Sequence, residues 1–291
     1  MESSVLTDIF LPASLFIIML GMGLSLVVDD FRRIVKYPKA TIIGLVNQLI
    51  FLPAIGFGIC HLLNLPNELA IGVMLLAACP GGVTSNLISH LSRGDTALSI
   101  SLTAVSSFIT LITIPLYVGF ALNYFSNSGQ AVDVDEVGMI LQVLVIVIIP
   151  VALGMFIRSR RENFAIRMDG PVRIVSIILF VTILLSIIIK ERETIVEYFP
   201  QIGGATVALN ILTLLVGYYS AKLLKLDQKQ AITIAIESGI QNGTLAIVIA
   251  STVLANFTLS IPAGIYSMVM FISAGVIMYF SGRRKKKVVE E

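Results

Sequence analysis

Nine long apolar runs, separated by short polar connections, constrain what this chain can fold into. A membrane-spanning helix needs about 20 predominantly apolar residues. Such runs lie at residues 9–28, 40–62, 69–91, 96–122, 137–157, 172–189, 202–224, 231–254 and 263–281. Only 13% of the 291 residues are charged, against about 25% in soluble domains, and the runs are too long for barrel strands. We therefore expect an all-α polytopic membrane protein with nine transmembrane helices in a single membrane domain.

The basic residues predict the orientation of the chain. Lys and Arg gather in the cytoplasmic connections of membrane proteins. Alternate connections, together with the tail after residue 281, carry eighteen of the twenty Lys and Arg residues, and the other two are Lys190 and Arg192. We expect a protein of the cell (inner) membrane with its N-terminus outside and its C-terminus in the cytoplasm. No basic region precedes the first run, so we expect it to be a retained span.

Glu237 lies near the middle of the eighth run, where a carboxylate is costly. A charged side chain at the centre of a bilayer costs roughly 2.5 kcal/mol or more, and the other seventeen acidic residues lie in connections, at run ends or at the termini. Ser238, Gln241 and Asn242 supply oxygen atoms beside it, and Gly239 allows the helix to open. Two interpretations stay open: a protonated Glu hydrogen-bonded within a helix bundle, or a cation site in a broken helix.

The third run is interrupted as well. Pro80 removes a backbone donor, and the two glycines after it free the chain. If residues 9–122 and 172–281 are two repeats of four spans, with the span at 137–157 between them, both interruptions fall at the third span of a repeat. The first repeat starts outside and the second inside, so the repeats are inverted. Interrupted helices at matching places in inverted repeats point to the binding site of a secondary transporter. We expect the two broken helices to cross at the midplane.

The oxygen atoms around the two interruptions suit sodium, a hard cation. Glu237 supplies a negative charge. One candidate site adds neutral side-chain oxygens from the third and fourth runs: Ser85, Asn86, Ser99 and Thr103. A second candidate site adds amide and backbone oxygens: Gln48, Gln241 and the carbonyls near Ser238 and Ile240.

The starts of the two inner half-helices suit an anion, because a helix N-terminus offers free N–H groups and partial positive charge. These starts follow Gly82 and Asn242. The candidate substrate-binding residues are therefore Val83, Thr84, Asn242 and Gly243. In a low dielectric each bound ion makes the binding of the opposite charge less costly, which would couple anion and cation.

These motifs resemble those of the bile acid:sodium symporter family, and the chain is similar to its bacterial-type, nine-span form. The resemblance covers nearly the whole chain and is carried by residues 79–86 (CPGGVTSN), 93–99 (RGDTALS) and 237–242 (ESGIQN). It implies a core of spans two, three, four, seven, eight and nine, and a panel of spans one, five and six. Some relatives carry a His–Asn pair on the last span, where this chain has Met270 and Phe271.

The resemblance also implies two coupling sodium ions. The first would be held at the positions Ser85, Asn86, Ser99, Thr103 and Glu237. The second would be held at Gln48, Glu237 and Gln241, with the backbone of Ser238 and Ile240.

The leading hypothesis is a secondary active transporter that couples sodium to the symport of an organic anion by alternating access. The resemblance implies a bile-acid-like compound or a small carboxylate such as pantoate as substrate. A proton-coupled carrier using Glu237 and a passive facilitator are the alternatives. An intramembrane aspartyl protease needs two adjacent carboxylates, and only Glu237 lies at depth, so we expect no enzyme. The expected partners are the anion, sodium ions and the lipid bilayer, without nucleic acid.

Overall fold

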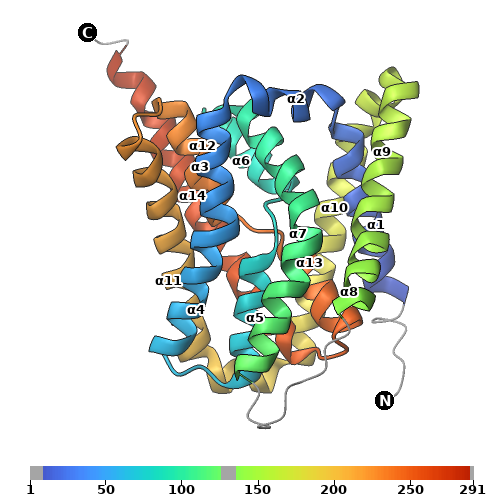
Figure 1. Cartoon of the computed structure of the whole chain (residues 1–291), viewed down its shortest axis with the longest axis vertical. Helices are drawn as coiled ribbons and strands as arrows, with labels where there is room; N and C mark the ends of the chain where they lie inside the picture. Colours follow the sequence, from blue (N-terminus) through green and yellow to red (C-terminus); the bar gives the residue numbers. More distant parts are fainter. Residues whose placement is uncertain (1–8, 126–135, 289–291) are drawn as a thin grey trace.

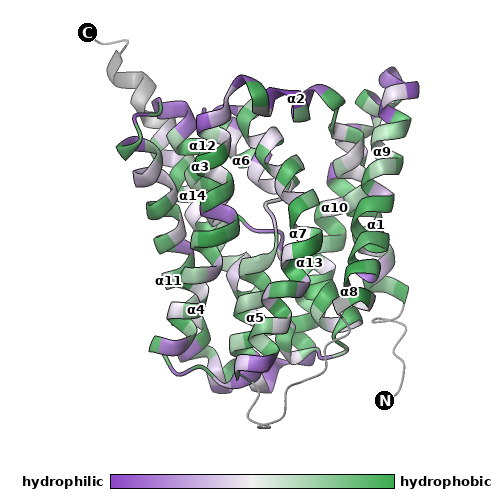
Figure 2. Ribbon diagram, viewed as in Figure 1, coloured by the Kyte–Doolittle hydropathy of each residue, from purple (hydrophilic) through white to green (hydrophobic). Residues whose placement is uncertain are grey.

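The computed structural model describes residues 9–125 and 136–288, which form a bundle of helices (Figure 1). Within these residues there is no strand. Seven helices are long and apolar enough to cross a membrane, and one bent pair counts as an eighth. Hydrophobic residues cover the middle of the bundle, and hydrophilic residues gather towards its two ends (Figure 2). The predicted helical membrane protein is confirmed. A ninth span would be α1 (Leu11–Ser25), an apolar helix of only 15 residues, so the nine-span count stays a prediction.

The first half of the chain contains spans two to four of the prediction. Span two is built from α3 (Pro38–Val46), the π-helical turn η2 (Asn47–Phe51) and α4 (Leu52–Leu62). Span three is the bent pair α5 (Asn67–Ala78) and α6 (Val83–Leu91). Span four is α7 (Thr96–Phe125).

The second half contains the remaining five predicted spans. They correspond to α8 (Glu136–Val143) with η3 (Leu144–Ile148) and α9 (Ile149–Arg160); α10 (Glu162–Lys190); α11 (Arg192–Leu223); α12 (Gln228–Gly239) with α13 (Gly243–Val248) and η4 (Ile249–Val253); and η5 (Thr258–Ser260) with α14 (Ile261–Val288). Helices α10 and α11 begin ten residues before the predicted starts of their spans. Hydropathy marks only the apolar part of a helix, and the first turns of both helices carry charged residues.

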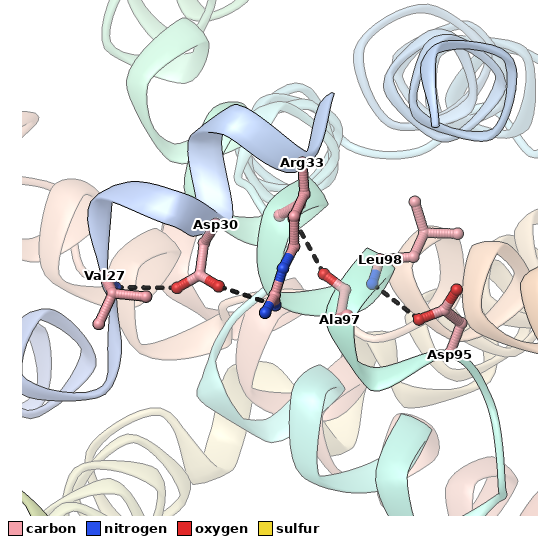
Figure 3. Close-up of polar contacts among 7 residues, drawn as sticks. Val27, Asp30, Arg33, Asp95, Ala97 and Leu98 are labelled. Carbon is pink, nitrogen blue, oxygen red and sulfur yellow. Dashed lines mark hydrogen bonds and ion pairs between the residues drawn. The ribbon is translucent and has the colours of Figure 1, made fainter. Parts of the chain in front are cut away.

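The first basic connection is a helix rather than a loop. Helix α2 (Val28–Lys36) lies across one end of the bundle (Figure 1). Acidic residues in its first turn and basic residues in its last turn complement the helix dipole. The buried Asp30 accepts hydrogen bonds from the backbone N–H of Val27 (2.8 Å) and from Arg33 (3.1 Å). Arg33 extends from α2 toward Ala97 in the first turn of α7 (Figure 3).

Two connections in different halves of the chain have the same backbone form. Residues 63–66 join α4 to α5, and residues 224–227 join α11 to α12. The second residue of each connection has a left-handed backbone, with φ of 47° at Asn64 and 59° at Lys225. The helices that follow, α5 and α12, both contain 12 residues and start from opposite ends of the bundle (Figure 1). Both end at an interruption.

Helix α1 packs against α9 and α10, whereas α11 packs against α4, α12 and α14. The contact between α1 and α9 brings the two backbones together. A Cβ atom on Gly23 would lie 2.2 Å from the carbonyl oxygen of Val151, and one on Gly154 would lie 2.4 Å from that of Leu20. Small residues allow such close approach between membrane helices.

Candidate functional site

The two interrupted helices meet at their breaks. Helices α5 and α6 form an angle of 63° across residues 79–82, and α12 is separated from α13 by residues 240–242. The backbone N–H of Asn242 donates to the carbonyl of Pro80 (2.9 Å), which joins the two breaks directly. Helix α6 packs against α12, and α5 packs against α13. The half-helices therefore cross, as predicted for a site built from two broken helices.

Four oxygen-bearing side chains gather around Glu237. Ser99 Oγ lies 2.5 Å from Glu237 Oε1, and Thr103 Oγ1 lies 2.9 Å from Oε2. The same two hydroxyls lie 2.8 Å and 3.2 Å from Asn86 Oδ1. Ser85 Oγ lies 3.5 Å from Thr103 Oγ1 and donates to the carbonyl of Gly82. The structure thus brings together all five residues of the first predicted cation site.

The hydroxyls of Ser99 and Thr103 each bridge Glu237 and Asn86. A hydroxyl carries one proton, and a side-chain amide carries both donors and an acceptor. When the amide of Asn86 turns its Nδ2 group toward the two hydroxyl oxygens, both hydroxyls can donate to the carboxylate. The carboxylate thus has two hydroxyl donors, which leave its charge to be balanced.

The charge of Glu237 has no basic partner within the described part of the chain. Every ion pair found there involves other residues. Glu237 is 2% exposed, and Ser85, Ser99 and Thr103 are fully buried. Burying an ionised carboxylate without a partner is strongly unfavourable, so its charge calls for a proton or a bound cation. A cluster of oxygen atoms around one carboxylate fits a hard cation such as sodium.

The second predicted set is centred on two glutamines. Gln48 Nε2 donates to Gln241 Oε1 (2.8 Å) and to the carbonyl of Cys79 (3.1 Å). Gln241 Nε2 donates to the carbonyl of Ser238 (2.9 Å). Ile240 lies buried in the break itself. The residues of the second set are therefore adjacent, with their amide groups hydrogen-bonded to one another and to the backbone.

Gln48 reaches this position from a π-helical turn. Such turns inside α-helices are frequent at functional sites. Pro53 follows the turn and cannot donate a backbone hydrogen bond to Leu49 four residues earlier. The hydroxyl of Tyr117 donates to that carbonyl instead (2.6 Å), which ties α7 to the turn that carries Gln48.

Two residues that support the second break were not identified from the sequence. Asn210 Nδ2 and the hydroxyl of Tyr266 both donate to the carbonyl of Gly239, at 2.7 Å and 2.9 Å. This carbonyl lies at the C-terminal end of α12, where the last carbonyls have no partner within the helix. Both side chains are fully buried. The one available signal was the amide of Asn210 within an otherwise apolar run.

A cavity of about 400 Å³ adjoins the crossing. Its wall is formed by the first turns of α6 and α13 together with parts of α1, α10 and α14. All four predicted substrate-binding residues line it: Val83, Thr84, Asn242 and Gly243. Met270 and Phe271 of α14 line it too. Asn242 also caps α13 by accepting from the N–H of Leu245 (3.0 Å). The cavity and the carboxylate cluster therefore share the same pair of interrupted helices.

A family model, described as the sodium bile acid symporter family, matches residues 12–198, which is more than half of the chain. The chain belongs to this family. Members of the sodium bile acid symporter family are transporters, so the predictions of the family and of a transporter rather than an enzyme are confirmed.

Similar proteins come from bacteria, plants and animals. The "uncharacterized sodium-dependent transporter YocS" of Bacillus subtilis (strain 168) is 31% identical over 279 residues, covering 96% of this chain and 85% of that protein. The "probable sodium/metabolite cotransporter BASS1, chloroplastic" of Arabidopsis thaliana is 31% identical, covering 95% of this chain and 68% of that protein. The "sodium/bile acid cotransporter 4" of Homo sapiens is 30% identical, covering 81% of this chain and 54% of that protein. The names of all three relatives state sodium dependence or cotransport with sodium.

Proposed function

We propose that this protein couples the movement of two sodium ions to the symport of an organic anion by alternating access. The observation that carries the proposal is the buried oxygen cluster around Glu237. In the first site, Ser85, Asn86, Ser99 and Thr103 would coordinate sodium together with Glu237. The relatives named for sodium dependence or cotransport support the choice of ion.

The number of oxygen ligands favours sodium over a proton as the coupling ion. A proton needs only one or two oxygens, whereas a hard cation takes several oxygen ligands. Glu237, Ser99, Thr103 and Asn86 bring side-chain oxygens within hydrogen-bonding distance of one another in a buried cluster.

The second sodium would bind where the two glutamines now contact each other. Gln48, Gln241 and the carbonyls of Ser238 and Ile240 would turn toward the ion, and Glu237 would be shared between both sites. A shared carboxylate makes the two sites dependent on one charge. We expect the substrate anion in the adjoining cavity, at Val83, Thr84, Asn242 and Gly243, with a bile-acid-like compound or a small carboxylate such as pantoate as the leading candidates.

The proposed architecture has nine spans in two inverted repeats, covering residues 9–122 and 172–281 with a span at 137–157 between them. The equal lengths of α5 and α12 and the similar connections before them support the repeat. We propose that α1, α8 with α9, and α10 form a panel that moves against a core of the other spans. The packing of α1 on α9 and α10 supports this division.

The proposed orientation can be tested with a matched pair of cysteine variants. Asn64 and Lys225 are both exposed and occupy the same left-handed position in equivalent connections, so the two cysteines have matched exposure and backbone conformation. In intact cells, Asn64→Cys should react with a membrane-impermeant thiol reagent, and Lys225→Cys should react only after the membrane is opened. The native Cys60 and Cys79 are buried and should not react with the reagent. Labelling of Lys225→Cys from outside the intact cell would contradict the proposed orientation.

The coupling ion is tested by uptake into proteoliposomes, with radiolabelled pantoate and cholate as the probes. We expect uptake driven by an inward sodium gradient at equal pH on both sides. Two sodium ions with one monovalent anion carry one net positive charge, which is worth about 2.3 kcal/mol per 100 mV, so an inside-negative potential should accelerate uptake. Uptake driven by a pH gradient without sodium would indicate a proton-coupled carrier, and uptake that no gradient drives would indicate a facilitator.

A further inference from the structure

A single pair of opposite charges lies on the wall of the substrate cavity. Asp169 and Arg173 of α10 both line it, and Arg173 Nη2 lies 2.8 Å from Asp169 Oδ2. Among the cavity-lining residues that the structure describes, Arg173 carries the only positive charge and Asp169 the only negative charge. Much of the remaining wall is apolar, including Val172 and Phe180 on the same helix.

Arg173 lies at the beginning of the apolar part of α10. It follows the first residue of the helix by eleven residues, and the apolar run begins at residue 172. A long basic side chain at such an edge can extend toward the polar end of a membrane. Arg173 differs from other basic residues near helix ends in its place on the cavity wall, where it pairs with Asp169.

The ion pair leaves Arg173 able to bind another anion. Its guanidinium has five N–H donors in a planar fork, a geometry that matches a carboxylate. The Arg173 side chain is 42% exposed and that of Asp169 is 44% exposed, so solvent or substrate can reach both. A solvated ion pair within one helix contributes little to stability, so a carboxylate from the substrate can replace Asp169 as the partner of Arg173.

We propose that Arg173 binds the anionic group of the transported substrate from the α10 side of the cavity, exchanging Asp169 for the substrate. The inference rests on the proposed anion symport and deepens it. The substrate class is an organic anion with an apolar body, because the charged partner is set in an apolar wall. The bound anion then contacts α10 on one side and the starts of α6 and α13 on the other, so it bridges the two helix groups. Asp169 keeps the guanidinium paired while no substrate is bound.

The ordinary alternative is that Arg173 only anchors the cytoplasmic end of α10. Arginine in that role sets membrane insertion and topology, and its loss would lower the amount of protein without changing which ligands the cavity prefers. The test must therefore measure discrimination by charge, which an anchoring residue does not affect.

The test compares the binding of acids and of their uncharged amides to purified protein in saturating sodium. The probes are pantoate, cholate and the primary amide of each, measured by titration calorimetry. We expect Arg173→Gln to weaken binding of the acid at least about tenfold, equal to about 1.4 kcal/mol, and to leave binding of the amide within about twofold. Arg173→Lys should recover part of the affinity, because it restores the charge without the planar fork. Asp169→Asn should tighten binding of the acid several-fold, because it removes the competing carboxylate.

Arg167→Gln is the matched control, since Arg167 lies six residues earlier on α10, is exposed and does not line the cavity. It should leave both affinities unchanged. Equal weakening of acid and amide by Arg173→Gln, or no weakening at all, would overturn the role of Arg173 and leave the symport proposal intact. If the wild-type protein binds neither acid in a sodium-dependent manner, the proposed substrate class fails, and this inference fails with it.

Discussion

Glu237→Gln should leave the protein folded in the membrane and abolish sodium-coupled uptake. Glutamine keeps the length of the side chain and one acceptor oxygen for Ser99 or Thr103, and a neutral amide is less costly to bury than a carboxylate. Both proposed cation sites lose their only formal charge. Hydrogen bonds and contacts to a charged group are worth about 1.5–3 kcal/mol, so sodium affinity should fall by about 10- to 100-fold.

The deciding measurement is sodium binding to purified wild-type and variant protein at one fixed pH. Glu68→Gln makes the same chemical change at an exposed carboxylate that accepts a hydrogen bond from Asn256 (2.9 Å), and it should bind sodium like the wild type. Uptake alone does not decide, since a proton-coupled carrier would also need Glu237. Wild-type affinity for sodium in Glu237→Gln would remove this residue from the cation site.

Gly81→Ala should lower the sodium affinity by a comparable amount, through steric crowding of Glu237 rather than through loss of its charge. A Cβ atom on Gly81 would lie 2.7 Å from Glu237 Oε2 and 3.2 Å from Ser85 Oγ. Both distances are too short for ordinary contacts, so either the carboxylate or the interrupted backbone must move. Because cation ligands need a fixed geometry, we expect sodium affinity to fall at least about tenfold, within the range of one lost charged contact.

The adjacent glycine provides a control at the same break. A Cβ atom on Gly82 would have its nearest neighbours at 3.8 Å, in the side chain of Asn242. Gly82→Ala should therefore keep sodium affinity within a few-fold of the wild type. Thermal unfolding of both variants separates a local effect from a loss of fold. If the two alanine variants bind sodium equally well, the close packing at Gly81 has no part in cation binding.

Hydropathy predicted most of the fold because the bilayer demands long apolar helices, and it failed where helices extend beyond the apolar layer. Helix α2 was taken for a loop because its nine residues include four charged side chains within residues 29–33. The charged first turns of α10 and α11 were excluded for the same reason. The nine-span count remains a prediction, since α1 has only 15 residues.

The residues around Glu237 could be proposed from the sequence because few polar groups occur inside apolar runs. Ser99 and Thr103 are four residues apart on one helix face, and both reach the carboxylate. Contacts that depend on distant segments left no local pattern. Tyr266 reaches the carbonyl of Gly239 across 27 residues, and no sequence pattern around Arg173 indicates that this residue lines the cavity.

The equal lengths of α5 and α12 have an electrical consequence. Each helix contains 12 residues and runs about 18 Å from its own end of the bundle to the crossing. An ion bound there lies at similar depths below the two surfaces, so it has crossed about half of the membrane voltage from either side. At 2.3 kcal/mol per charge per 100 mV for the whole membrane, each sodium ion bound at the proposed sites would exchange about 1.2 kcal/mol with the field on entering and a similar amount on leaving. The apparent sodium affinity on each side should therefore vary with membrane potential even when no substrate moves.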